Sequence, residues 1–518
     1  MKKINKILAA NRSEIAIRIF RASEESGIST VAVYSKEDRF ALHRFKTDES
    51  YLIGNNKGPI QAYLDIESII DIAKKANVDA IHPGYGFLSE NPDFAKACLQ
   101  NNIEFIGPSV EILQKLGNKT EAKKISESVN VPIIESIPIP SKFDINSLQN
   151  AAKKIGYPLM IKASWGGGGR GMRIVKSESQ LIDQIETAKN ESKKTFGKDE
   201  VFIEKYLEDA SHIEVQILGD KHNNIIHLFE RDCSIQRRYQ KIIERAPANF
   251  LNNELRKKIC DSAVKIAKKV NYVGAGTVEF LLDKKTGYYY FIEVNPRIQV
   301  EHTVTEEVTG IDIVKAQIKI AEGYKIGTDN SLPNQDKITL NGHAIQCRVT
   351  TEDPLNNFMP DYGKISTYRS ASGFGIRLDG ATATAGSVVT PYYDSLLVKV
   401  TSWANNVEES RKRMDRALRE FRIRGVKTNI VFLESLINHP SFINNKYNTR
   451  FVDEEKSLYN FKQKKDRASK LISLLGNIIV NGNSELPNNN FQESYSEPII
   501  PKHDTNLRKN NYVEMLKK

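Results

Sequence analysis

The sequence has few cysteines and no long apolar run, and each absence excludes classes of protein. Four cysteines occur among 518 residues, with no CxxC pair: Cys98, Cys233, Cys260 and Cys347. This spacing argues against a disulfide framework and a cysteine-based zinc site, and it favours a reducing compartment. No stretch approaches the roughly 18 apolar residues that a membrane helix needs. The apolar stretch at 7–10 is too short for a signal peptide, so we expect a cytoplasmic protein without membrane spans.

The sequence also lacks a basic stripe with interleaved aromatic residues, although its net charge is +11. Nucleic-acid binding needs such clustering, so we expect no nucleic-acid partner. We attribute the excess to a lysine-rich surface, and binding of anionic ligands is a further use for it. Hydrophobic residues make up 40% and charged residues 27%, which is typical of a globular protein. The length predicts roughly three domains.

The N-terminal part alternates between strand and helix patterns. Residues 5–10 and 29–34 are typical of buried strands, and the segment 13–26 between them has the apolar spacing of a helix. A strand–helix–strand unit of this kind predicts an α/β domain with a parallel sheet. Further elements are expected at 66–76 (helix), 78–82 (strand), from about 91 (helix) and 103–106 (strand).

The rest of the chain divides into two further units and a tail. The second unit has strand patterns at 158–163 and 172–175, a helix pattern at 254–270, and a hairpin pattern with strands at 276–283 and 288–294. The third unit is richer in strand patterns and closes with a helix that carries Met414, Leu418 and Phe421. The tail beyond about 483 is poor in apolar residues and has the composition of a linker. The predicted domains are 1–118, 119–336 with a lid at about 135–205, 337–455, and an extension with a flexible tail at 456–518.

A glycine-rich segment follows the strand pattern at 158–163. It contains four consecutive glycines, Gly166, Gly167, Gly168 and Gly169, a few residues after Lys162. Such glycines expose backbone N–H groups to the oxygens of a polyphosphate, and Lys162 offers a point charge. The spacing matches neither the P-loop nor the dinucleotide fingerprint. We favour a mobile phosphate-binding lid over a merely flexible loop.

The segment 293–301 alternates polar and apolar residues. In an extended chain the polar residues share one face, and Glu279, on the preceding hairpin strand, lies roughly opposite the first of them. Two carboxylates and an amide oxygen are ligands that Mg²⁺ accepts. The alternative is an ordinary strand with one solvated face. On the metal-site hypothesis Arg297 binds a planar anion such as bicarbonate, and Glu301 is a candidate base. The polar residues are Glu293, Asn295, Arg297, Gln299 and Glu301.

A third segment, 231–241, is densely basic and rich in amides. Taken alone, a solvated charge run and an anion-binding site explain it equally well.

These three segments, in this order, resemble the biotin carboxylase component of biotin-dependent carboxylases, which is an ATP-grasp enzyme. The resemblance covers roughly residues 4–455, and it is carried by the matching stretches 10–16, 82–90 and 293–302. Within the family the chain is most similar to the pyruvate carboxylases. The stretches of that type are 42–46, 348–354, 422–429 and 467–482.

The resemblance implies a multidomain α/β and α+β fold: an N-terminal α/β biotin carboxylase domain, an ATP-grasp domain with a glycine-rich lid, and a C-terminal biotin carboxylase domain. It implies that ATP phosphorylates bicarbonate to carboxyphosphate, after which the ureido nitrogen of biotin is carboxylated. The implied ATP-binding residues are Lys119, Lys162, Glu204, Lys205, Leu207, His212 and Gln236, with the four glycines and Tyr239 beside them. The implied ligands of Mg²⁺ or Mn²⁺ are Glu279, Glu293 and Asn295. The implied bicarbonate-binding residues are Lys241, Arg297, Gln299 and Val300, with Glu301 as the base and Arg348 stabilising the biotin enolate.

The resemblance also implies partners. We expect a ligase that works with a biotinylated carrier domain and a carboxyltransferase, and these parts together carboxylate pyruvate to oxaloacetate. We also expect the chain to form a homo-oligomer. No biotin-acceptor motif is visible before Lys518. We therefore expect those parts in another chain or missing by truncation.

Four positions depart from the family pattern: Asn118 replaces Asp, Ser13 replaces Gly, Tyr362 replaces Thr, and Tyr239 replaces a residue that is usually His and sometimes Asn. None removes a metal ligand, the base or Arg348, so we expect an active enzyme. Three alternatives remain. They are the biotin carboxylase subunit of an acetyl-CoA or propionyl-CoA carboxylase, another ATP-grasp ligase of the carbamoyl phosphate synthetase type, and a catalytically degenerate nucleotide-binding scaffold.

Overall fold

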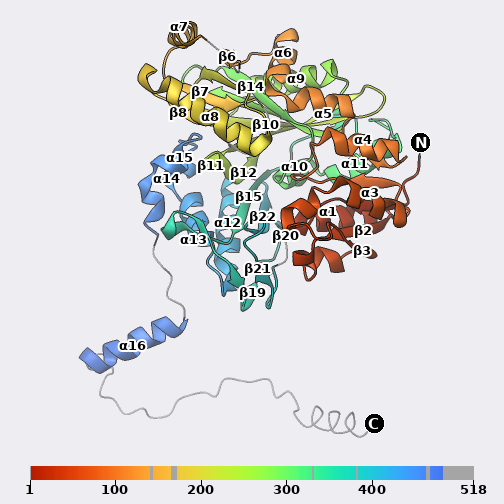
Figure 1. The fold of residues 1–518 in the computed structure, drawn as a ribbon. Coiled ribbons are helices and arrows are strands. Elements are labelled where there is room, and N and C mark those ends of the chain that lie inside the picture. The colour runs from red at the N-terminus through yellow and green to blue at the C-terminus, as the bar shows by residue number, and fades with distance from the viewer. Residues whose placement is uncertain are drawn as a thin grey trace. The chain divides into compact units, whose positions relative to one another are not determined.

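A computed structural model describes residues 2–140, 144–164, 172–328, 332–380, 383–461 and 467–481. The chain forms two compact units, 1–461 and 462–518 (Figure 1). The predicted glycine lid at 166–169 and the predicted flexible tail beyond 483 lie outside the described residues.

The N-terminal part of the first unit is built on a five-stranded parallel sheet, drawn in red in Figure 1. The strand order is β3-β2-β1-β4-β5, and every pairing in it is parallel. The predicted α/β domain with a parallel sheet is therefore confirmed. The short strand β3, with its half-buried polar sequence, was not predicted. The strands are β1 (Lys6–Ala9), β2 (Ser29–Tyr34), β3 (Glu49–Leu52), β4 (Ala80–His82) and β5 (Glu104–Phe105).

Helices pack around this sheet because their apolar faces match its buried strands. In α1, for example, Ile15 and Ile19 are buried on the same side, at the spacing of one helical turn. The helices of this region are α1 (Ser13–Glu24), α2 (Pro59–Tyr63), α3 (Ile66–Lys75), α4 (Pro92–Gln100), α5 (Val110–Gly117) and α6 (Lys119–Ser128).

A four-stranded antiparallel sheet follows, with the order β6-β9-β7-β8. The helices α7 (Ile145–Ile155) and α8 (Leu181–Phe196) bury their apolar faces in the same core as β7 and β9. The strand patterns at 158–163 and 172–175 are confirmed as β7 and β8. The strands are β6 (Ser136–Ile139), β7 (Leu159–Ala163), β8 (Arg173–Val175) and β9 (Val201–Lys205).

An eight-stranded antiparallel sheet forms the centre of the unit, in the order β14-β13-β10-β11-β12-β15-β22-β20. It is continuous across position 336, because β12 pairs with β15 from Cys347 to Ala344. The predicted helix at 254–270 is α9, and the predicted hairpin is β13–β14. The strands are β10 (Ala210–Gly219), β11 (Ile225–Arg237), β12 (Gln240–Ala246), β13 (Gly274–Asp283), β14 (Tyr289–Asn295), β15 (His343–Thr350), β20 (Ile376–Gly380) and β22 (Leu396–Ala404).

The remaining helices pack on this sheet, and short strand pairs complete the C-terminal part. The helices are α9 (Asn253–Lys269), α10 (His302–Thr309), α11 (Ile313–Glu322), α12 (Val407–Glu420), α13 (Ile430–Ile437), α14 (Pro440–Ile443) and α15 (Phe451–Glu454). The short strands are β16 (Glu352–Asp353), β17 (Met359–Pro360), β18 (Gly363–Lys364), β19 (Thr367–Arg369), β21 (Val388–Val389) and β23 (Arg422–Arg424).

The extended segment expected over 293–301 is only partly formed. β14 ends at Asn295, and residues 296–301 form a turn that leads into α10. Pro296 has no N–H for the ladder, and the Arg297 N–H folds back onto the Asn295 carbonyl at 2.9 Å. The expectation of one continuous polar face along this segment is therefore wrong beyond Asn295.

The second unit has one described helix, α16 (Arg467–Asn481). It leaves large apolar side chains such as Leu471, Ile479 and Val480 exposed. Among the described residues no helix combines the length and hydropathy required to cross a bilayer.

Candidate active site

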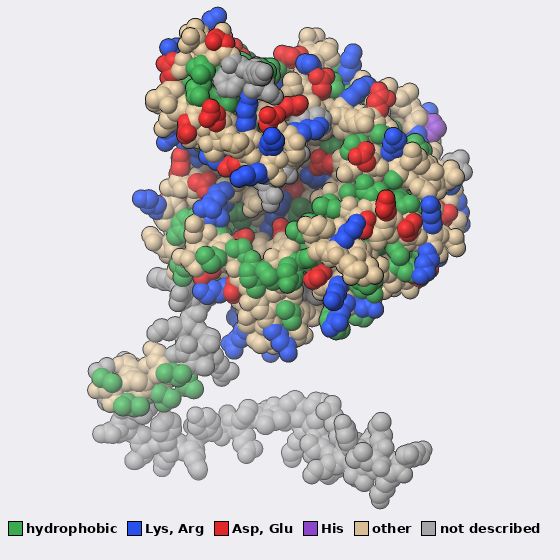
Figure 2. All heavy atoms as spheres, viewed as in Figure 1, with side chains coloured by type: hydrophobic (Ala, Val, Ile, Leu, Met, Phe, Trp, Pro, Cys, Tyr) green, Lys and Arg blue, Asp and Glu red, His purple; other side chains and the backbone are tan. Residues whose placement is uncertain are grey.

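A cavity of about 1210 Å³ opens where the parallel sheet, the four-stranded sheet and the central sheet meet. Figure 2 shows the hollow in the face of the unit, with acidic and basic side chains around it. The lining comes from the loop after β1, the loop after β4, the strands β7, β10 and β12–β15, and the turn before α10. Residues from all three predicted domains therefore meet at one cavity.

A row of charged residues, the acidic floor, crosses four strands at the base of the cavity: Glu279 and Glu293 line the cavity, and Glu214 and Arg231 are fully buried next to them. Glu293 pairs with Glu279, Glu279 pairs with Glu214, and Glu214 pairs with Arg231. Residues directly opposite each other on neighbouring strands present their side chains on the same face. Strand register therefore brings three carboxylates together, although they lie up to 79 residues apart in the chain.

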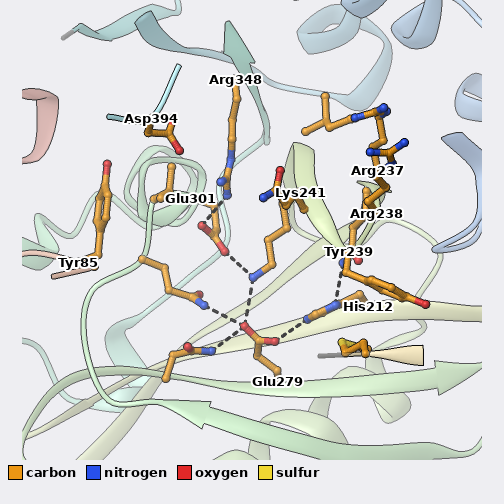
Figure 3. A pocket seen from close by; sticks show the side chains of 18 of the residues that line it. Tyr85, His212, Arg237, Arg238, Tyr239, Lys241, Glu279, Glu301, Arg348 and Asp394 are labelled. Carbon is orange, nitrogen blue, oxygen red and sulfur yellow. Dashed lines mark hydrogen bonds and ion pairs between the residues drawn. The ribbon is translucent and has the colours of Figure 1, made fainter. Parts of the chain in front are cut away.

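Lys241 neutralises this acidic floor (Figure 3). Its Nζ lies 2.7 Å from Glu301 and 3.1 Å from Glu279, and it also contacts Glu214. Burial lowers the pKa of Lys241, but the three carboxylates outweigh burial and raise the pKa well above its ordinary value. Lys241 is therefore a fixed cation among three acids.

Glu301 is held between Lys241 and Arg348, whose Nη2 donates to Glu301 at 3.0 Å. Burial raises the pKa of Glu301, but Lys241, Arg348 and Arg231 prevail and hold the pKa well below its ordinary value. The carboxylate is thus ionised at neutral pH. Arg348 in turn is oriented by Glu244, to which its Nε donates at 2.6 Å.

His212 projects from β10 toward the same acids. Its Nε2 lies 2.9 Å from Glu279 and 3.3 Å from Glu214, and Gln236 lies 2.8 Å from its Nδ1. Burial lowers the pKa of His212, but Glu279 and Glu214 reverse the shift and raise the pKa to about 9. His212 therefore carries a positive charge at neutral pH.

The predicted metal ligands are adjacent. Glu279 and Glu293 face each other across β13 and β14, and the Asn295 amide nitrogen lies 2.8 Å from Glu279 and 3.5 Å from Glu293. Lys119 binds Glu293 at 2.9 Å. The two carboxylates fit a hard cation such as Mg²⁺. Asn295 fits once its amide turns its oxygen inward, because that oxygen now accepts from Arg297 at 3.1 Å.

The far end of the cavity carries the lysines predicted to contact nucleotide phosphates. Lys162 contacts Glu204, which also binds Lys123 at 2.7 Å. Burial raises the pKa of Glu204, but Lys162 and Lys123 prevail and lower it. Lys205 donates to the Gly156 carbonyl at 2.9 Å, and Leu207 lines the same wall.

Arg297 and Gln299 are held by their neighbours. The Arg297 Nε donates to Glu90 at 2.6 Å. Gln299 donates to Glu279 at 2.9 Å and accepts from Arg231 at 2.7 Å. Both residues line the cavity together with Val300.

The basic segment 231–241 has two environments, which the sequence alone did not separate. Gln236 and Lys241 line the cavity from the strands, and Arg238 and Tyr239 line it from the tight turn between β11 and β12. Arg231 does not line the cavity: it is fully buried and donates to Glu214 and Gln299. Both turn residues have positive φ, 48° and 65°, as a two-residue hairpin turn requires. Burial raises the pKa of Tyr239 to about 12, so its hydroxyl remains protonated.

The structure brings together every described residue that the sequence singled out for the site, although the roles of these residues remain predictions. It also adds residues that sequence reasoning missed. The alternation of His212, Glu214 and Gln216 along β10 is a signal that could have identified Glu214. The missed residues are Tyr85, Glu90, Lys123, Glu214 and Glu244.

Two of the departures from the family pattern have clear structural consequences. Asn118 caps α6, because its Oδ1 accepts from the Thr120 N–H at 2.9 Å and the Glu121 N–H at 3.2 Å. Ser13 has φ of 62°, in the left-handed region that favours glycine. The first substitution keeps a good cap, whereas the second places strain beside the cavity.

Three domain families match the chain. They are the biotin carboxylase N-terminal domain over residues 3–113, the ATP-binding domain of the carbamoyl-phosphate synthase L chain over 118–328, and the biotin carboxylase C-terminal domain over 346–454. Pyruvate carboxylase of Bacillus subtilis is 55% identical over 482 residues, which is 93% of this chain and 42% of that protein. The chain thus spans about two fifths of the length of this relative.

Solved structures agree with these matches. A pyruvate carboxylase structure from Rhizobium etli has a TM-score of 0.86 and 57% identity, and the match covers 92% of this chain and 42% of that one. The biotin carboxylase domain of 2-oxoglutarate carboxylase from Hydrogenobacter thermophilus was solved as a dimer with MgADP, ADP and bicarbonate. It has a TM-score of 0.85 and 44% identity over 89% of this chain and 100% of that one. Because the three domain matches follow one another along the chain and the solved biotin carboxylase domain is matched over its full length, this chain belongs to the biotin carboxylase family.

Proposed function

We propose that the chain carboxylates biotin with ATP and bicarbonate, through carboxyphosphate. The observation that supports this most directly is the chain of contacts Arg348–Glu301–Lys241–Glu279, which joins an ionised acid, two cations and a candidate metal ligand in one buried cavity. Bicarbonate is a poor electrophile, and phosphorylation gives it a leaving group. Transfer of a phosphoryl group needs positioning and charge neutralisation more than covalent chemistry.

In this proposal Lys241 and Arg297 bind bicarbonate, with Gln299 and Val300. Lys119, Lys162, Glu204, Lys205, Leu207, His212 and Gln236 bind ATP, with Tyr239 at the rim. Glu279, Glu293 and Asn295 hold Mg²⁺ or Mn²⁺, which when bound neutralises the phosphate oxygens. The domain limits proposed are those given above: 1–118, 119–336, 337–455 and 456–518.

Glu301 takes the proton of bicarbonate. Lys241 and Arg348 hold the pKa of Glu301 low, which keeps it ready to accept a proton but makes it a weak base. An anion that draws Lys241 toward itself removes part of this stabilisation, and the pKa of Glu301 rises. Binding of bicarbonate and activation of the base are thus coupled through one ammonium group, and Arg348 then faces the biotin that receives the carboxyl group.

The test is biotin-dependent release of ADP by the purified chain, with free biotin, bicarbonate and MgATP. Arg297→Ala and Glu301→Gln are assayed beside the parent. We expect ADP release from the parent and a loss on the order of 100-fold or more in Glu301→Gln, the usual range for a general base. Equal release from all three proteins would exclude this function and favour a nucleotide-binding scaffold.

We further propose that the chain is the biotin carboxylase part of a pyruvate carboxylase in the cytoplasm. The names of its relatives and the helix α16 in the stretch 467–482 support the first part, and four buried free cysteines are compatible with the second. Its partners would be a biotinylated carrier domain, a carboxyltransferase and a second copy of this chain. Adding a biotinylated carrier and a pyruvate carboxyltransferase should yield oxaloacetate; transfer to acetyl-CoA or propionyl-CoA instead would contradict the assignment.

A further inference from the structure

Glu14 is a buried acid that touches the cavity without a role in the reaction described above. It lies in the first turn of α1, and its side chain is 2% exposed. One carboxylate oxygen accepts from the Tyr85 hydroxyl, and the other lies 3.0 Å from the Lys399 ammonium. The two partners come from distant elements, the loop after β4 and strand β22. Glu14 therefore joins the N-terminal sheet to the C-terminal part of the unit.

Lys399 extends this connection to the backbone that carries the candidate base. Its side chain is fully buried, and its Nζ donates to the Val300 carbonyl at 3.0 Å. That carbonyl belongs to the peptide group whose nitrogen is the Glu301 nitrogen. Lys399 is also in register with Arg348 on β15, whose guanidinium binds Glu301 at 3.0 Å. Backbone and side chain of Glu301 are thus both held from β15 and β22.

Tyr85 is the second group that Glu14 holds, and it lines the cavity. Figure 3 shows Tyr85 on one side of Lys241, with His212 and Tyr239 on the other. The loop around Tyr85 is fixed by Asn11, whose Nδ2 donates to the carbonyls of Pro83 and Tyr85, both at 2.8 Å. The segment 11–14 therefore controls both the backbone and the hydroxyl of Tyr85.

The backbone on both sides of the Glu14–Tyr85 contact is strained. Ser13 has φ of 62° and Phe87 has φ of 43°, in the left-handed region that residues other than glycine rarely adopt. Gly84 also has positive φ, and a Cβ there would lie 3.0 Å from Asn11 and Ile15. Strain of this kind persists where surrounding contacts over-determine it, and it is common at functional sites.

A purely structural role for the Glu14–Lys399 ion pair does not explain why its contacts lead to Tyr85 and to the Val300 carbonyl. A buried pair is often replaceable by apolar residues of similar volume at no loss of stability, yet both arms of Glu14 end on groups that line the cavity. We propose that Glu14 is a positioning residue, which through Tyr85 and through Lys399 and the Val300–Glu301 peptide shapes the bicarbonate-binding end of the cavity. This inference rests on the proposed function, and it adds Glu14, Tyr85 and Lys399 to the residues that determine bicarbonate affinity.

The test separates stability from bicarbonate binding. Glu14→Leu leaves the buried Lys399 ammonium without Glu14, and Lys399→Met leaves the Glu14 carboxyl, whose pKa burial raises to about 7, without the cation that opposes this shift; both should lower stability. The double variant removes the whole pair and should regain most of it. Its KM for bicarbonate should nevertheless stay about tenfold or more above that of the parent, the change expected for a lost hydrogen bond to a charged group. The KM for MgATP should change less than about twofold, because neither residue faces the lysines of the phosphate end.

Tyr85→Phe removes a single hydroxyl and is the variant least prone to misfold. We expect its KM for bicarbonate to rise about threefold to tenfold, the equivalent of one ordinary hydrogen bond. The matched control is Arg256→Met with Glu230→Gln, a buried ion pair outside the cavity lining. The control should lower stability and leave the KM for bicarbonate within about twofold.

The outcomes are distinguishable. A double variant that regains both stability and the parental KM for bicarbonate, together with an unchanged Tyr85→Phe, would overturn this inference alone. A parent without bicarbonate-dependent ADP release would overturn the proposed function, and this inference with it.

Discussion

Lys241→Met should reverse the pH dependence of stability contributed by the acidic floor. In the parent, Lys241 holds the pKa of Glu279 and Glu301 well below the ordinary value, against the effect of burial. Groups of this kind contribute stability that is present above the unfolded pKa and lost as pH falls through the folded pKa. Without the ammonium, burial dominates and the folded pKa values rise, so the variant loses stability as pH increases.

The magnitude follows from the loss of one partner of a buried ion network, which costs about 3–5 kcal/mol. A carboxylate whose pKa is higher in the folded than in the unfolded protein lowers the free energy of unfolding by about 1.4 kcal/mol for each pH unit between its two pKa values. Urea denaturation of parent and variant at pH 5.5 and pH 8 measures this. We expect the difference in unfolding free energy to be larger at pH 8 by about 1–3 kcal/mol.

Lys241→Arg is the matched control, because it keeps the charge and should keep the sign of the parental pH dependence. An equal cost of Lys241→Met at both pH values would refute the reasoning. It would mean that Arg231, Arg348 and His212 suffice to hold the acids ionised.

Three further predictions concern single residues. Asn118→Ala should lower the unfolding free energy by about 1 kcal/mol, the usual value of a lost N-cap. Asn118→Asp is the control that should leave stability unchanged. If urea denaturation shows no loss for Asn118→Ala, the capping role is contradicted. In the folded protein the pKa of His212 is about 9, above its value in the unfolded chain. Its contribution to stability is therefore complete below about pH 6.5 and is lost as pH rises toward 9. His212→Gln should flatten the plot of unfolding free energy against pH between these values, and an unchanged slope would argue against a charged His212. Tyr239→His restores the family residue and, if a cationic ring aids the nucleotide, should lower the KM for ATP severalfold at pH 6 and little at pH 8; equal effects at both pH values would exclude a charge effect.

Much of the fold could be predicted from periodicity, because the spacing of apolar residues within a single helix or strand indicates which of its faces is buried. The helix pattern of Met414, Leu418 and Phe421 matches α12, and all three side chains are buried, although the helix ends at Glu420, one residue before Phe421. The hairpin β13–β14 was equally clear from its turn at 284–287. By contrast, β3 was missed because Glu49–Leu52 is half-buried and largely polar.

The site was predictable where chemistry lies in one continuous segment, and not where it depends on strand register. Glu293 through Glu301 could be singled out by residue type, yet Pro296 ends the strand and redirects the chain. Glu214 becomes part of the floor through its pairing with Glu279 and Arg231, which nothing in the linear order indicates. The Glu14–Lys399 pair joins residues 385 positions apart and has no local pattern at all.

The central sheet has a practical consequence for anyone who divides this chain. A fragment that stops at 336 would leave the β12 edge without β15, exposing unpaired N–H and C=O groups and the apolar side chains of Ile243 and Ile235, which now pack against the C-terminal core. Such an edge invites intermolecular strand addition. Fragments bearing only the nucleotide-binding half should therefore aggregate, whereas a cut after 461 leaves every ladder of the central sheet intact.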